Sequence, residues 1–314
     1  MRLTEAIAAL IQAIIADGRS PKTAETYRGH LRYLVDFLGD VEIETITVDQ
    51  LRAYAVDLRQ RGRRWSEHPH HDPKEGGLSP FTVASYVNHA KRLFNWLYEE
   101  GLLTNNPAAR LKRANPPRHG PKGISAEDFK KLLRATAGQT LYDLRARALI
   151  LFLADTGARR GGVERLKIDD LDLANMRALV TEKGERSRFV FFSPVTRDAL
   201  KAWLDARPNK GPWVFVALGP KGEERMTGDA IRTMLERLGK RAGCTGPINP
   251  HAFRHGFARD FILNGGGLSE LADILGHKAL ETTREFYAIF QIGELQRVHR
   301  RFSPVARLGE NEDV

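Results

Sequence analysis

The sequence predicts a mainly α-helical protein with a small β component, an α+β fold divided into two domains. Apolar residues recur at helical spacing through most of the chain, and only residues 178–180 and 189–192 have the composition of strands. The 314 residues exceed one ordinary domain, and 42% hydrophobic with 28% charged residues is typical of a folded protein. A Pro- and Gly-rich basic stretch, residues 115–123, predicts a linker between residues 1–114 and 124–314.

Four helices are predicted in residues 1–114. The first follows from apolar residues three or four positions apart, namely Leu3, Ile7, Leu10, Ile11 and Ile14. The other three begin at residues that cap helices: Ser20 before Pro21, Thr47 with Gln50, and Ser79 before Pro80. Residues 1–114 are therefore expected to form a helical domain.

A polar insert separates the last two of these helices, at residues 63–77. Histidine is a common metal ligand, and the insert contains His68, His70 and His71 beside Asp72. The spacing differs from that of regular zinc motifs, and the segment contains Pro and Gly. A solvated loop is the favoured interpretation, so no metal is expected.

The second domain is predicted to contain the larger core. Ser125 and Asp128 indicate a capped helix, and a strongly apolar helix is expected over residues 141–154. The two strand segments are joined through residues 183–187, which predicts a basic β-hairpin. Further helices are expected to open near Thr227, at Asn249 with Pro250, and near Ser269.

Composition indicates the class of partner. The formal net charge of +10 favours a polyanion, with nucleic acid ahead of a membrane surface. No segment has the length of a transmembrane helix or the features of a signal peptide, so a cytoplasmic protein is expected. Cys244 is the only cysteine, which excludes an intrachain disulfide and a cysteine-based metal site.

Several polar residues follow helix boundaries where a site could form. A helix starting at Asn249 and Pro250 would place His251 and Arg254 on one face, one turn apart. Arg159 follows Gly157, which is expected to end the apolar helix. Taken singly, each residue has an ordinary interpretation as a surface charge on a basic protein.

Three more residues have equally ordinary interpretations when taken alone. Lys183 lies at the predicted hairpin tip, where a solvated turn lysine is common. His277 follows Leu275 and Gly276 at the end of a short amphipathic helix. Tyr287 comes ten positions later and by itself is an unremarkable half-buried tyrosine.

In this order the residues resemble the tyrosine recombinase family, also called the phage integrase family. The resemblance covers nearly the whole chain and implies an N-terminal SAM-like core-binding domain followed by a catalytic domain. Within the family, the sequence is most similar to a simple Xer-type or transposon-type site-specific recombinase. All six positions expected of an active member are matched, namely Arg159, Lys183, His251, Arg254, His277 and Tyr287.

The resemblance implies the chemistry of each position. Arg159 and Arg254 would stabilise the charge that develops on the phosphate, because guanidinium stays protonated and binds phosphate through forked hydrogen bonds. His251 would accept the proton of the Tyr287 nucleophile, and Lys183 would protonate the departing 5′ oxygen. His277 would hydrogen-bond the phosphoryl oxygens.

A 3′-phosphotyrosine conserves the phosphoester, so strand exchange through a Holliday junction requires neither ATP nor a metal, and no cofactor is expected. The partners implied are double-stranded DNA with a specific site and further copies of the chain in a tetramer on two sites. A second recombinase as partner is left open.

Two departures from the family pattern stand out. Gly162 occupies a position, three residues after the first Arg, where many members have an acidic residue, and Glu164 is a candidate for the missing supporting contact. Phe286 precedes Tyr287, so Tyr287 is the only tyrosine available at the nucleophile position.

Alternatives remain for the function and for the C-terminal tail. A type IB topoisomerase would use a similar site to relax DNA, and a non-catalytic DNA-binding protein would share only the fold. In the tail, Leu295, Val298 and Phe302 recur at helical spacing beside basic residues. By resemblance this apolar face docks on a neighbouring protomer, and the alternative is that it folds back on its own domain.

Overall fold

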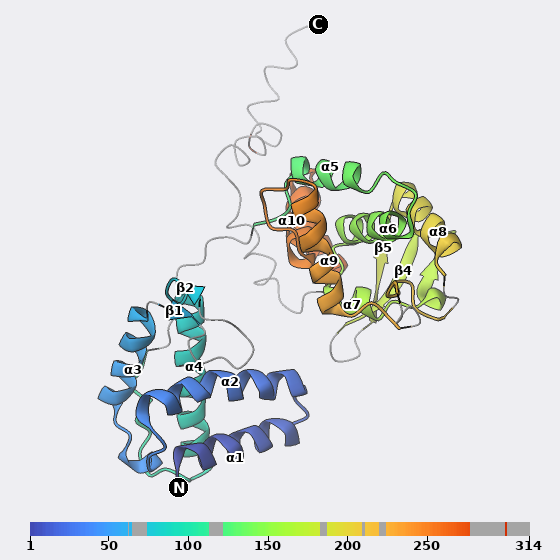
Figure 1. Ribbon diagram of the computed structural model, residues 1–314. Helices are drawn as coiled ribbons and strands as arrows, with labels where there is room; N and C mark the ends of the chain where they lie inside the picture. The colour runs from blue at the N-terminus through green and yellow to red at the C-terminus, as the bar shows by residue number, and fades with distance from the viewer. Residues whose placement is uncertain are drawn as a thin grey trace, which may run out of the picture. The chain divides into compact units, whose positions relative to one another are not determined.

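The computed structural model describes residues 1–61, 63–64, 74–112, 122–182, 187–208, 211–219, 224–276 and 299. The chain divides into two compact units, Met1–Arg118 and His119–Val314 (Figure 1). Each unit has its own buried hydrophobic core. The fold class is confirmed, because helices dominate and the larger sheet has three short strands.

The first unit contains the four predicted helices. They are α1 (Leu3–Ala16), α2 (Pro21–Leu38), α3 (Val48–Gln60) and α4 (Pro80–Glu99). The expected caps form: the Ser20, Thr47 and Ser79 side chains each accept a hydrogen bond from the backbone N–H three residues on. Helix α4 packs against the other three, and its Phe94 and Leu97 are fully buried in the shared core.

The polar insert has one feature that the sequence did not predict. Two-residue strands at its ends, β1 (Arg63–Arg64) and β2 (Lys74–Glu75), pair antiparallel. The histidines at 68, 70 and 71 lie outside the described residues.

The second unit surrounds a three-stranded antiparallel sheet with helices. The strands are β3 (Leu171–Asp172), β4 (Arg177–Thr181) and β5 (Ser187–Phe191), in the order β3-β4-β5. The helices are α5 (Ala126–Ala135), α6 (Leu141–Thr156), α7 (Arg160–Glu164), α8 (Pro194–Ala206), α9 (Gly228–Arg241), α10 (Pro250–Leu263) and α11 (Leu268–Leu275).

Helix α6 is the centre of this unit. It packs against α8, α10 and β5, and Figure 1 shows it between α10 and α8. Its residues Leu149, Ile150, Phe152 and Leu153 are fully buried, which explains why the segment is apolar on every side. A rigid, enclosed helix thus positions the residues that follow Thr156.

The predicted hairpin is confirmed, with Leu179 opposite Phe189 in the register of β4 and β5. Strand β3 and helix α7 were not predicted, because two and five residues are too short for a periodic pattern. Helix α8 was also missed, although Ser193 and Pro194 repeat the start signal of α2. None of the helices that the structure describes is long and apolar enough to cross a bilayer.

Candidate active site

Gly157 ends α6 and sets the direction in which Arg159 leaves it. The backbone there is left-handed, with φ of 58°, a conformation that glycine adopts without steric cost. A Cβ atom at this position would lie 2.8 Å from Phe257 Cδ1 and 2.9 Å from Leu275 Cδ2. Both constraints require glycine, so the chain turns sharply and Arg159 becomes the N-cap of α7.

Arg254 is the buried residue of the candidate site. Pro250 opens α10, and the Asn249 side chain accepts a hydrogen bond from the N–H of Ala252 at 3.0 Å. One turn further on, the Arg254 side chain is only 3% exposed. Its Nη1 donates to the carbonyl of Gly157 at 2.8 Å and its Nη2 to the carbonyl of Leu275 at 2.7 Å. This guanidinium therefore connects the ends of α6 and α11 to α10.

A second arginine of the site, Arg188 on β5, is half-buried and lies beside the first. Its side chain is 13% exposed and donates to the carbonyl of Ile274 and to Glu182 Oε1, at 3.1 Å from Nη2. Gly276 is left-handed, with φ of 64°, and a Cβ there would lie 2.8 Å from Arg188 Cδ. Arg188 and Arg254 thus bind the carbonyls of Ile274 and Leu275, the last two residues of α11, shortly before position 277.

One carboxylate bridges two of the arginines. Glu182 accepts hydrogen bonds from Arg188 through Oε1 and from Arg159 through Oε2, and its own side chain is 12% exposed. The sequence singled out neither Glu182 nor Arg188. The signal was weak, because Glu182 borders a turn and Arg188 is one of many basic residues.

The site carries more positive than negative charge. Burial is the main cause that lowers the pKa of Arg254, and the nearby charges of Arg159 and Arg188 lower it further, to about 8. Burial also lowers the pKa of Arg188, to about 10. Among the described residues, one carboxylate pairs with Arg159 and Arg188, and Arg254 donates to backbone carbonyls, so the arrangement favours binding of an anion such as a phosphodiester.

His251 lies at the N-terminal end of α10 with its side chain exposed. Its pKa is lowered from the usual 6.5, first by desolvation and then by the charges of Arg254, Arg160 and Arg159. The imidazole is consequently neutral at pH 7 and can accept a proton. This is the protonation state that a general base requires.

The structure brings together only part of the predicted set. Arg159, His251 and Arg254 are mutually close, as their electrostatic coupling shows. Lys183, His277 and Tyr287 lie outside the described residues. Of the described residues that precede the first two in the chain, Glu182 accepts a hydrogen bond from Arg188, and a Cβ added at Gly276 would lie 2.8 Å from Arg188 Cδ.

Glu164 does not make the supporting contact to Arg159 for which the sequence made it a candidate. Its carboxylate lies 3.6 Å from Arg225 Nη2, and Glu182 contacts Arg159 instead. Within the described part of the chain, no group of three or more His, Cys, Asp and Glu side chains could hold a metal ion.

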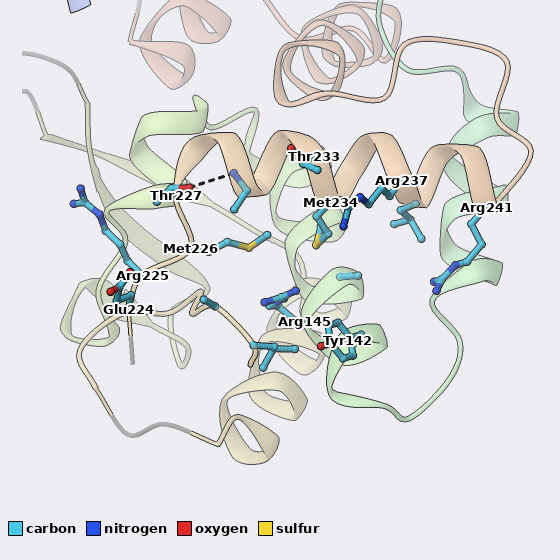
Figure 2. A pocket seen from close by; sticks show the side chains of 15 residues that line it. Tyr142, Arg145, Glu224, Arg225, Met226, Thr227, Thr233, Met234, Arg237 and Arg241 are labelled. Atoms are coloured by element: carbon cyan, nitrogen blue, oxygen red, sulfur yellow. Dashed lines mark hydrogen bonds between the residues drawn. The ribbon is translucent and has the colours of Figure 1, made fainter. Parts of the chain in front are cut away.

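A cavity of about 620 Å³ on the same unit is separate from these residues (Figure 2). It lies between α6 and α9 and is lined by apolar side chains such as Met226 and Met234, with arginines among them. Arg145 is used structurally, since its Nη1 donates to the carbonyl of Val216 at 2.9 Å. The three predicted site residues that the structure describes, Arg159, His251 and Arg254, do not line this cavity.

We expect the pKa of His251, measured by NMR titration, to lie below 6.5. Arg160→Gln should move it back towards that value, because one of the cations that disfavour imidazolium is removed. Arg232→Gln, on α9 and paired with Glu236, is the control and should leave it unchanged. A wild-type pKa at or above 6.5, or no response to Arg160→Gln, would contradict this electrostatic account.

Comparison with known proteins identifies the family. Residues 122–291 match the phage integrase family, and residues 2–113 match the phage integrase SAM-like domain. Tyrosine recombinase XerD of Listeria innocua is 26% identical over 302 residues, which cover 93% of this chain and 96% of the relative. Tyrosine recombinase XerC of Alcanivorax borkumensis is 26% identical over 300 residues, covering 94% and 92%.

Solved structures share the fold. The Tn1549 transposon integrase in complex with a circular intermediate DNA has a TM-score of 0.73 at 18% identity, covering 96% of this chain and all of that one. A lambda integrase dimer bound to a core site has a TM-score of 0.71 at 16% identity, covering 91% and 95%. With the family match spanning more than half of its residues, the protein belongs to the phage integrase family of tyrosine recombinases.

Proposed function

We propose that the protein is a site-specific DNA recombinase that cuts and rejoins strands through a 3′-phosphotyrosine. The observation that carries this proposal is the cluster of Arg159, Arg188 and Arg254, which adjoins the positions where Lys183 and His277 follow in the chain. The curated relatives that cover nearly all of the chain are named tyrosine recombinases, which supports the same activity.

In the proposed reaction, Tyr287 Oη attacks the scissile phosphorus while His251 takes the phenolic proton. A tyrosine hydroxyl has an ordinary pKa of about 10 and needs such help at neutral pH. The P–O5′ bond breaks, Lys183 protonates the departing oxygen, and Arg159 and Arg254 stabilise the added negative charge with His277. Attack by a 5′ hydroxyl of the partner strand reverses these steps and releases the tyrosine.

The proposed partners are duplex DNA and other copies of the chain. Solved relatives include integrases bound to DNA sites and a lambda integrase tetramer bound to a Holliday junction. We infer an analogous tetramer on two sites, with affinity dominated by phosphate contacts of this basic protein. The curated relatives are named tyrosine recombinases, and these names do not favour a topoisomerase or a non-catalytic DNA-binding protein.

Tyr287→Phe should abolish covalent capture of DNA while preserving DNA binding, because only the nucleophilic oxygen is lost. The target is first recovered by sequencing genomic DNA fragments that the wild-type protein retains under denaturing conditions, and a duplex of that sequence is called the site duplex. Adduct formation on denaturing gels and binding on native gels are then compared. Normal adduct formation by the variant would rule out Tyr287 as the nucleophile.

Lys183→Ala should slow cleavage of the site duplex, because the 5′ oxygen then leaves without a proton. Replacing that oxygen by sulfur should restore much of the rate, since a thiolate leaves unprotonated. Single-turnover adduct formation measures both substrates. An equal defect on the oxygen and sulfur substrates would show that Lys183 is not the general acid.

Ending the chain after Gln291 should leave binding to one site largely intact but abolish the tetrameric complex and recombination. The physical reason is the apolar face of Leu295, Val298 and Phe302, which we propose docks on a neighbouring protomer. Native gels and recombination of two sites test this expectation. Tetramers and normal recombination by the truncated protein would show that the tail does not couple the protomers.

A further inference from the structure

Glu182 is the acidic residue that directly contacts the arginines of the candidate site. It follows β4 and lies between two cations, with one carboxylate oxygen towards Arg188 and the other towards Arg159. The Arg188 contact is made by two nitrogens, Nε at 3.3 Å and Nη2 at 3.1 Å. Oε1 thus accepts from Arg188 and Oε2 from Arg159, and such charge-assisted hydrogen bonds are stronger than those between neutral groups.

Gly162 provides the room for this carboxylate. A Cβ at position 162 would lie 3.3 Å from Val180 Cβ and 3.9 Å from Glu182 Cγ. A longer side chain there would enter the space that Glu182 occupies. The family commonly has an acidic residue at the position of Gly162, so in this chain the carboxylate comes instead from the end of the neighbouring strand.

Arg159 needs such a partner more than Arg254 does. Arg254 is fixed by two backbone carbonyls, whereas the Arg159 side chain is 35% exposed and its described hydrogen bond is to Glu182. Arginine side chains have many rotamers, so an unrestrained guanidinium loses more freedom when it binds phosphate. Burial is the main cause that lowers the pKa of Arg159, and repulsion by the charge of Arg188 lowers it further.

We propose that Glu182 is a positioning residue, which orients Arg159 towards the scissile phosphate by bridging it to Arg188 and which replaces the acid missing at Gly162. The proposal rests on the recombinase function. Glu182 need not touch DNA, because its effect passes through the Arg159 guanidinium. The proposal predicts that a carboxylate between the two arginines is required, whichever position of the chain provides it.

The test measures single-turnover adduct formation on the site duplex by three variants. Glu182→Gln should slow adduct formation at least about tenfold, as expected for a misplaced catalytic group, while DNA binding and the unfolding temperature change little. Gly162→Glu combined with Glu182→Ala should recover much of that loss, because the new carboxylate enters the vacated space. Glu164→Gln, which removes the partner of Arg225, is the matched control and should cleave normally.

A second substrate separates positioning from a purely structural role. With a neutral methylphosphonate at the scissile position, less negative charge develops in the transition state, so the defect of Glu182→Gln should shrink. A wild-type rate for Glu182→Gln, or an equal defect on both substrates without recovery in the exchanged variant, would overturn the proposal. Absence of any adduct with the wild-type protein would instead reject the recombinase function itself.

Discussion

The candidate site depends on the buried guanidinium of Arg254. Its hydrogen bonds to the carbonyls of Gly157 and Leu275 join α10 to the ends of α6 and α11. Hydrogen bonds to charged groups stabilise by about 1.5–3 kcal/mol each, and loss of a buried charged partner leaves both carbonyls unsatisfied. The residue proposed to bind phosphate is therefore also the one that fixes the neighbouring chain segments, so position and charge are set together.

The same constraint explains the electrostatics of the site. Burial of several cations is unfavourable, and here Glu182 offsets the charge of Arg159 and Arg188 only in part. Burial lowers the pKa of each arginine, repulsion between arginines lowers it further for Arg159 and Arg254, and the arginine charges also contribute to keeping His251 neutral. A phosphate entering the site would supply the missing negative charge, so the free protein is already arranged for an anionic substrate.

Much of the fold could be predicted from the sequence because it is encoded locally. The Ser20, Thr47, Ser79 and Ser125 caps and the apolar stretch of α6 each depend on residues within a few positions of one another. Arg159, His251 and Arg254 were predicted as site residues from helix-boundary signals of the same local kind, together with the family resemblance.

The contacts that complete the site are long-range and have no local pattern. Glu182 meets Arg159 across 23 positions, and Arg188 reaches Ile274 across 86. Glu164 was the nearer acid in sequence, yet α7 places it beside Arg225. The pairing of β4 with β5 and their packing against α7 and α11 decide which carboxylate, Glu182 or Glu164, reaches Arg159. This part of the site therefore could be found only from the structure.

The most direct test of the account is a crystal structure of the full-length protein trapped on its recombination site. The account predicts a DNA 3′-phosphate joined to Tyr287, with non-bridging oxygens about 2.7–3.2 Å from guanidinium nitrogens of Arg159 and Arg254. Arg254 should also retain its bonds to the Gly157 and Leu275 carbonyls. A phosphate bound away from these arginines, or a linkage to another residue, would contradict it.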